Sequence, residues 1–204
     1  MYDHDVVERA MAIHAETHGR QPDCVAYAPG RIEVLGNHTD YNEGTVLSAA
    51  INMGHCFCIS KAAGPGVRLT AGDVHETTAF DPRTEERLEK RHQWANYVKG
   101  VMYYLHNQGI ETGAVDCTFL GSIPMGAGLS SSAALEVATA YAVLEFAGGE
   151  LDQKEIGILA QAAEHNFAGC NCGLLDQFYR IFGVDHGLIH SDFRSLETYP
   201  VKLP

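Results

Sequence analysis

The feature that most limits the fold is a segment, residues 130–146, that is apolar on nearly every side. Between Ser130 and Phe146 the only charged residues are Glu136 and Glu145, and a glycine pair follows. A helix with apolar side chains all round is buried in the core. We therefore expect the other elements to pack around this helix, and 204 residues suffice for one large domain.

The remaining segments predict an α+β fold. Apolar spacing with a stop at Gly19 predicts a helix over 3–18, and glycines divide a strand-rich stretch from 24 to 80. A helix is predicted over 92–108, a short buried strand over 115–120, and another helix after a capping box formed by Asp152 and Glu155. Two strands, near 178–184 and 187–190, complete the chain. We expect helices packed on a mixed, largely antiparallel sheet.

The charge balance argues against nucleic acid and membrane partners. The formal net charge is −12 and the 14 lysines and arginines are scattered, so a polyphosphate chain would be repelled. No apolar run approaches the roughly 18 residues that span a bilayer. The acidic first residues lead into an amphipathic helix and do not resemble a signal sequence.

The cysteines predict reduced thiols and a cytoplasmic location. They are spread through apolar segments. A zinc site at the pairs Cys56/Cys58 and Cys170/Cys172 is the alternative, but the usual finger spacing is absent.

A glycine- and serine-rich segment, 121–134, lies between the predicted strand and the buried helix. Gly126 and Gly128 let the backbone approach a ligand closely, and Ser130, Ser131 and Ser132 bring hydroxyls to the helix N-terminus. Unpaired amides and the positive end of the helix dipole lie there too, which is a way to bind phosphate.

Two other kinds of phosphate-binding loop fit this segment less well. A Walker loop needs a lysine that is absent, and a dinucleotide fingerprint needs glycine at Ser131. An ordinary helix cap with a glycine turn remains open. The three serines favour the phosphate site, because hydroxyls can also bind Mg²⁺.

Two further polar segments are candidates for ligand binding or catalysis. Residues 28–44 contain Arg31, Asn37, His38 and Asp40, a set of hydrogen-bonding groups that suits a polyhydroxylated ligand. The alternative is a polar β-turn. Asp176 lies in a glycine-flanked apolar loop, 169–178, where a carboxylate either caps a turn or performs chemistry.

The segment 124–133, PMGAGLSSSA, resembles the nucleotide loop of the GHMP kinases. The resemblance implies their N-terminal domain fold (ribosomal protein S5 domain 2-like). It implies that ATP phosphates are held by Gly126, Ala127, Gly128, Leu129, Ser130, Ser131 and Ser132. It also implies that Ser131 or Ser132 helps to hold Mg²⁺, with Glu164 as the magnesium carboxylate. Taken alone, Glu164 would be a solvated helix charge.

Residues 28–44, taken together, resemble the galactokinase signature, and 94–100 also resembles a galactokinase stretch. The resemblance implies that Asp40 binds sugar ring hydroxyls, with Asn37 and His38 in the sugar site, His38 near the exocyclic carbon. Arg31 would stabilise the transferring phosphoryl group.

Two positions in this segment depart from the family pattern. The family usually has asparagine at Glu33 and, at Asn37, a glutamate that contacts the C6 hydroxyl. Because an amide donates as well as accepts, a C6 carboxylate or another substituent becomes conceivable. Glu33 is also a candidate ion-pair partner for Arg31.

The loop 169–178 resembles the C-G-x-M-D-Q segment of galactokinases, with Leu175 in place of methionine. The resemblance implies that Asp176 accepts or orients the proton of the anomeric hydroxyl. A nearby Arg31 would keep Asp176 ionised.

The resemblance implies a domain organisation and an activity. We expect 1–204 to be one GHMP N-terminal domain, with a sugar signature at 28–44, a phosphate loop at 121–134 and a base loop at 169–178. The further C-terminal domain of the family is missing. The implied activity is phosphorylation by ATP of the anomeric hydroxyl of galactose or a closely related sugar, incomplete in this chain.

Three other functions remain open. They are a non-catalytic sugar and nucleotide sensor, a GHMP kinase for another small alcohol, and a purely structural protein.

Overall fold

A computed structural model describes residues 3–36, 39–124, 126–170, 173–183 and 187–202. These residues form one seven-stranded sheet in the order β4-β3-β5-β2-β6-β7, with β1 paired to β2 outside that path. The strands are β1 Cys24–Leu35, β2 Thr45–Lys61, β3 Val67–Ala71, β4 Glu76–Phe80, β5 Val115–Gly121, β6 Gly187–Asp192 and β7 Glu197–Lys202.

The predicted mixed, largely antiparallel sheet is confirmed. Among its strand pairs only β3 and β5 run parallel. The long strand β2 joins two parts of the sheet, because residues 45–48 pair with β6 and residues 55–61 pair with β5.

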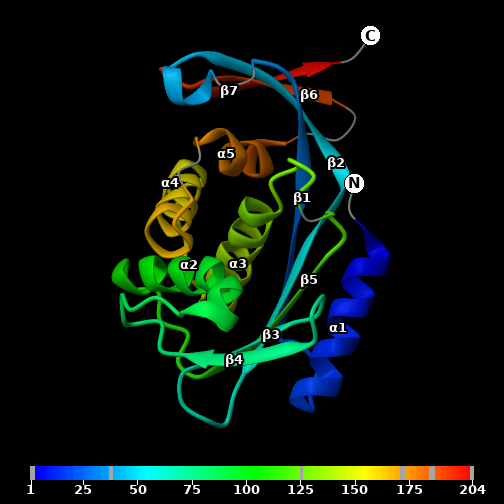
Figure 1. The fold of residues 1–204 in the computed structure, drawn as a ribbon, viewed down its shortest axis with the longest axis vertical. Coiled ribbons are helices and arrows are strands. Elements are labelled where there is room, and N and C mark those ends of the chain that lie inside the picture. The colour runs from blue at the N-terminus through cyan, green and yellow to red at the C-terminus, as the bar shows by residue number, and fades with distance from the viewer. Residues whose placement is uncertain (1–2, 37–38, 125, 171–172, 184–186, 203–204) are drawn as a thin grey trace.

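Helices cover both faces of the sheet (Figure 1). Helix α1 lies on one side, and the other helices lie on the opposite side. They are α1 His4–His18, α2 Asn96–Asn107, α3 Ser131–Ala147, α4 Gln153–Ala163 and α5 Leu175–Phe182, with 3-10 turns η1 Asp40–Asn42 and η2 Lys90–Ala95 and the π-helical turn η3 Glu164–Ala168.

Helix α3 is the centre of the core, as its all-apolar sequence predicts. Every residue from Ala133 to Ala140 is buried, including Glu136, which is fully inaccessible to solvent. The helix contacts β1, β2 and the neighbouring helices α2, α4 and α5. Its N-terminus is therefore held rigidly at one place in the fold, directly after the glycine-serine segment.

Helix α1 begins and ends as the sequence predicts. The Asp3 carboxylate accepts a hydrogen bond from the Val6 amide, and Gly19 ends the helix with a φ of 73°. Its face packs against Cys56 and Cys58, which are both buried. The described cysteines are free thiols.

The expected strand over 178–184 is wrong. Most of it belongs to helix α5, because Phe178, Ile181 and Phe182 follow the i, i+3, i+4 spacing of a helix. Aromatic and β-branched residues favour strands in composition, which explains the error. The strand near 187–190 is confirmed as β6, whereas β7 was not predicted because most of its side chains are exposed. The helix expected over 92–108 starts as the turn η2 and becomes α-helical at Asn96.

Within the described ranges, no helix combines the length and apolar character that crossing a bilayer requires.

Candidate active site

Arg31 joins three segments that lie far apart in the sequence. Its side chain is buried, with the residue only 9% exposed, on the sheet face that α5 covers. One Nη atom donates a hydrogen bond of 2.7 Å to the Gly128 carbonyl oxygen, and the other pairs with the Asp176 carboxylate. The structure thus brings β1, the glycine-serine loop and α5 together at one arginine.

The loop between β5 and α3 has the backbone that its glycines predict. Gly126 and Gly128 have φ angles of 72° and 68°, a left-handed conformation that glycine adopts at little cost. Ser130 has a φ of 52° and makes no capping hydrogen bond with its side chain. A non-glycine residue in that region costs about 1–3 kcal/mol, and such strained residues are common at functional sites.

Two of the three serines have distinct neighbours. A hydrogen bond of 2.7 Å joins Ser131 Oγ to His55 Nε2 on β2, and Ser132 Oγ donates to Glu164 Oε1 at 2.6 Å. Of the two serines considered for Mg²⁺, Ser132 is therefore the one next to the candidate carboxylate. His55 was missed by the sequence analysis, because nothing local to it indicates a contact with the loop.

Glu164 is not a solvated helix charge. It begins η3 and is only 3% exposed. Gln177 Nε2 donates to Glu164 Oε2 at 2.8 Å and to Glu136 Oε2 at 3.2 Å, and both Gln177 and Glu136 are fully buried. Gln177 follows Asp176 directly, so this amide fixes the position of α5 relative to α3 and η3. A signal was present in the sequence, since a charge inside an apolar helix, such as Glu136, needs a buried partner.

Asp40 lies against Gly173, in the loop just before Asp176. It begins the turn η1, and a Cβ atom at Gly173 would overlap its carboxylate. Glycine at 173 is therefore required for this approach. Of the residues predicted to bind sugar, Asp40 lies at the site, whereas Asn37 and His38 fall outside the described residues.

Glu33 does not pair with Arg31. Within the described part of the chain no ion pair joins the two residues, and Glu33 Oε1 is buried without a hydrogen-bond partner. Both residues line a pocket of about 650 Å³ that also includes Gly128 and Leu129 from the loop. A carboxylate therefore lies beside the segment predicted to bind phosphate.

Several carboxylates of this site lie near the Cys170 thiol. Partial burial raises the pKa of the Cys170 thiol, and the charges of Glu164, Glu136 and Asp176 raise it further. A cation at the site would reduce the repulsion between these carboxylates and a polyphosphate.

The residues present suit Mg²⁺ whose ligands come partly from substrate and water, and they do not suit a metal ion held by protein side chains alone. Among the described residues no group of three or more His, Cys, Asp or Glu side chains is close enough to hold a metal. Mg²⁺ is commonly bound by one or two carboxylates together with substrate phosphates and water. The adjacent Ser132 hydroxyl and Glu164 carboxylate provide such a partial set of oxygen ligands.

Two family models match the chain in sequence. "GHMP kinases N terminal domain" matches residues 96–184, and "Galactokinase galactose-binding signature" matches residues 12–61. The galactokinase of Haemophilus influenzae (strain KW20/Rd) is 36% identical over 200 residues, which are 97% of this chain and 52% of that protein. The galactokinase of Pasteurella multocida is 36% identical over 199 residues, 97% and 51% of the two chains.

Solved structures have the same fold. Lactococcus lactis galactokinase complexed with galactose superposes with a TM-score of 0.88 at 30% identity, covering 98% of this chain and 52% of that one. A D-glycero-D-manno-heptose 1-phosphate kinase from Bacteriodes thetaiotaomicron has a TM-score of 0.72 at 22% identity, covering 88% and 60%, and supports the fold alone.

Residues 96–184 match the N-terminal domain of the GHMP kinases, and the chain has the fold of that domain. It is similar to the N-terminal portion of galactokinases. The chain spans about half the length of the curated relatives that it matches.

Proposed function

We propose that the full-length protein transfers a phosphoryl group from ATP to the anomeric hydroxyl of galactose or a closely related sugar. The observation that supports this most is the junction at Arg31, which contacts Asp176 and the phosphate-loop carbonyl at Gly128. A base, a cation and a phosphate loop are the parts that phosphoryl transfer requires. We assign 1–204 to one N-terminal domain with its sugar signature at 28–44.

The described residues then have separate roles. Asp40 accepts hydrogen bonds from adjacent sugar hydroxyls and orients the ring. Asp176 takes the proton of the anomeric hydroxyl as the hydroxyl oxygen attacks the γ-phosphorus of ATP, the bond from that phosphorus to the bridging oxygen breaks, and ADP leaves. Arg31 pairs with Asp176 and stabilises the charge of the transferring group. The loop 126–132 and the N-terminus of α3 hold the ATP phosphates.

Ser132 and Glu164 would hold Mg²⁺, which neutralises phosphate charge when it is bound. Gln177 orients Glu164 through its hydrogen bond of 2.8 Å, as partners of metal ligands commonly do. Because several carboxylates lie at this site, we expect nucleotide to bind more weakly without the metal ion. We place the protein in the cytoplasm, where the described free thiols would stay reduced.

We also propose that a C-terminal half completes the site. Exclusion of water strengthens the electrostatic interactions on which this chemistry depends. The 204-residue chain alone is therefore expected to bind ligands more readily than it turns them over.

A substrate panel tests the proposal. The full-length protein is incubated with ATP and Mg²⁺ and with galactose, galacturonate, 6-deoxygalactose or N-acetylgalactosamine, and the products are read by ³¹P NMR. We expect an anomeric phosphate on at least one galactose-configured sugar. Activity confined to non-sugar alcohols would reject the assignment. Sugar and nucleotide binding with no transfer would instead establish a sensor.

A further inference from the structure

Strand β2 contacts the glycine-serine segment near both of its ends. Near the first end, the Gly54 amide donates to Ser122 Oγ at 3.1 Å, and the Ser122 amide donates to the Gly54 carbonyl oxygen at 2.9 Å. Near the other end, His55 Nε2 lies 2.7 Å from Ser131 Oγ. Two consecutive residues of one strand therefore hold the loop that runs from β5 to α3.

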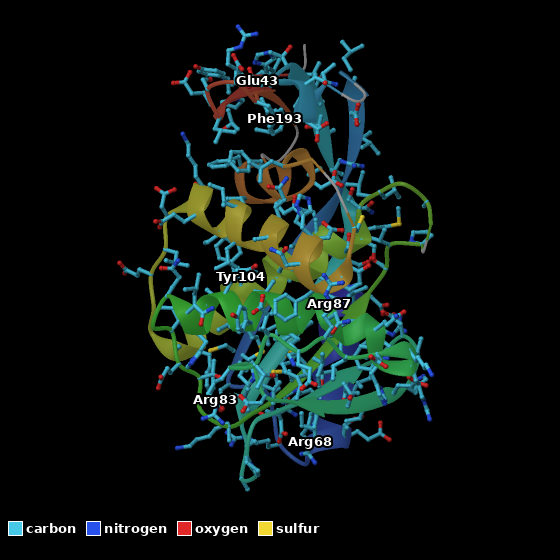
Figure 2. All side chains as sticks on the ribbon, turned by 60° about the vertical axis from the view of Figure 1, so that its left-hand side comes forward. Glu43, Arg68, Arg83, Arg87, Tyr104 and Phe193 are labelled. Atoms are coloured by element: carbon cyan, nitrogen blue, oxygen red, sulfur yellow. The ribbon has the colours of Figure 1, made fainter. Side chains whose placement is uncertain are left out.

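These contacts lie at one end of the β2–β5 pair. His55 is paired with Gly121, the last residue of β5. Ser60 is paired with Asp116 at the other end, where Arg68 donates to the Asp116 carboxylate. Figure 2 shows Arg68 at one extremity of the molecule. Ser60 therefore lies on the same strand as His55 but at the end remote from the loop.

The His55 ring is fixed by its packing. The residue is only 5% exposed and shares a sheet face with Phe57, which belongs to the core formed with α3. A Cβ atom at Gly121 would come within 2.3 Å of the ring atom Cε1, so glycine at 121 makes room for the ring. Phe119 lies beside it, with 6.2 Å between the ring centroids. The ring is thereby directed at Ser131.

The direction of the hydrogen bond decides what Ser131 can offer a ligand. A serine hydroxyl has one proton and two acceptor sites. If Ser131 donates to the ring, its proton is used within the protein. If His55 Nε2 donates, that proton remains for a ligand oxygen. Because the oxygens of an ionised phosphate only accept hydrogen bonds, a bound phosphate favours the second arrangement.

Ser131 is partly exposed and is the first residue of α3, where the helix amides and dipole favour an anion. We propose that His55 is a positioning residue for the nucleotide: its Nε2 donates to Ser131 Oγ and leaves the hydroxyl proton for a phosphate oxygen. The inference rests on the proposed phosphate site but not on the proposed sugar chemistry, because nucleotide binding is measured without turnover.

A double-mutant cycle tests whether His55 acts through Ser131. The full-length protein is compared with His55→Leu, His55→Gln, Ser131→Ala and the double variant of His55→Leu and Ser131→Ala. Affinity for ADP is measured by titration calorimetry at saturating Mg²⁺, and urea denaturation gives the free energy of unfolding. Ser60→Ala is the matched control, because it removes a buried hydrogen bond of 2.9 Å to His14 from the remote end of β2.

We expect His55→Leu to weaken ADP binding about tenfold, a typical cost of losing one hydrogen bond to a charged group. His55→Gln, whose amide can donate to the same hydroxyl oxygen, should restore most of this affinity. The double variant should bind ADP no more weakly than Ser131→Ala alone. Ser60→Ala should lower the free energy of unfolding without weakening ADP binding.

Four results would overturn the proposal. They are parent-like affinity in His55→Leu, an effect of His55→Leu that multiplies with that of Ser131→Ala, affinity in His55→Gln as low as in His55→Leu, and an equal loss of affinity in Ser60→Ala. A parent protein that binds ADP but phosphorylates no sugar would reject the proposed chemistry and leave this inference intact. A parent protein that does not bind ADP would reject both.

Nitrogen NMR gives a test that does not depend on how His55→Leu folds. In the parent protein labelled with ¹⁵N at histidine, the Nε2 signal reports whether this atom carries a hydrogen. The His55 signal is assigned by its absence from His55→Gln. With ADP and Mg²⁺ bound we expect a hydrogen on Nε2, and an Nε2 without one would overturn the proposal.

Discussion

The Arg31 guanidinium pairs with the Asp176 carboxylate across 145 residues of sequence. The pair joins strand β1 to helix α5, and a second hydrogen bond from Arg31 reaches the loop that precedes α3. A cation, a carboxylate and the backbone of the glycine-serine loop are thereby fixed at one point. The proposed chemistry depends on this junction. Three nearby positions test its surroundings, and His14, on the buried side of α1, tests the pH dependence of the fold.

Replacing Ser132 by alanine is expected to weaken Mg²⁺ binding more than replacing Ser131. Ser132 lies 2.6 Å from Glu164, whereas Ser131 is hydrogen-bonded to His55. In Ser132→Ala we expect the Mg²⁺ concentration that gives half-maximal nucleotide binding to rise about tenfold. A loss of this size is typical when metal ligation is disturbed. Titration calorimetry of both variants with ADP and increasing Mg²⁺ measures it. Equal effects of the two substitutions would contradict the assignment.

Gln177→Leu should destabilise the fold strongly. It removes the side-chain amide that donates a hydrogen bond to each of two buried carboxylates, Glu136 and Glu164, so each of them loses one hydrogen bond. A loss of about 2–4 kcal/mol in the free energy of unfolding is expected. Urea denaturation measures it, with Gln108→Leu on the exposed end of α2 as the control. If the two variants unfolded at the same urea concentration, the buried network would have no structural role.

The fold should lose stability on mild acidification through His14. Burial, and secondarily the neighbouring His18, lowers the pKa of His14 from 6.5 to about 4. The side chain is fully buried between Thr118 and Ser60. Below about pH 6.5 the His14 ring takes up a proton in the unfolded chain but not in the folded chain. The contribution of neutral His14 to the free energy of unfolding is therefore complete above that pH. This stabilisation is lost as the pH falls towards 4, by at most about 1.4 kcal/mol per pH unit.

The variant His14→Gln isolates this effect. It retains hydrogen-bonding groups but cannot titrate, so its free energy of unfolding should fall less steeply between pH 6.5 and 4.5. Urea denaturation at several pH values provides the comparison. Identical slopes for the variant and the parent chain would show that another group is responsible.

Glu33→Gln is expected to stabilise the chain and to tighten nucleotide binding. Glu33 Oε1 is buried without a partner in the described part of the chain and lies in the pocket lined by the phosphate loop. Removing the negative charge lowers the desolvation cost by about 1 kcal/mol and reduces repulsion of phosphate. Thermal unfolding and ADP binding with Mg²⁺ are the measurements. Weaker binding in the variant would mean that Glu33 itself holds a ligand.

The sequence predicted those parts of the site that depend on local patterns. The loop with Gly126 and Gly128 and the buried helix after it follow from residue order alone, and the backbone confirms them. The error at 178–184 arose because a short aromatic segment satisfies both strand composition and helical spacing. Tertiary packing decided between the two, since Phe178 packs against Val46 from β2.

Long-range partners could not be inferred in the same way. The contact between His55 and Ser131 joins residues 76 positions apart, and neither segment shows which residue it will meet. The same holds for Gln177, whose buried contacts with Glu136 and Glu164 depend on how three helices pack. The Arg31–Asp176 contact was anticipated only through resemblance to a family.

The central claim is that Asp176, held by Arg31, removes the proton during phosphoryl transfer. Its most direct test is the turnover rate of Asp176→Asn in the full-length protein, with sugar and nucleotide binding measured in parallel and Asp5→Asn, exposed on α1, as the control. The account predicts a rate lower by about 10²–10⁴ with binding retained. A rate close to that of the control would remove Asp176 from the mechanism.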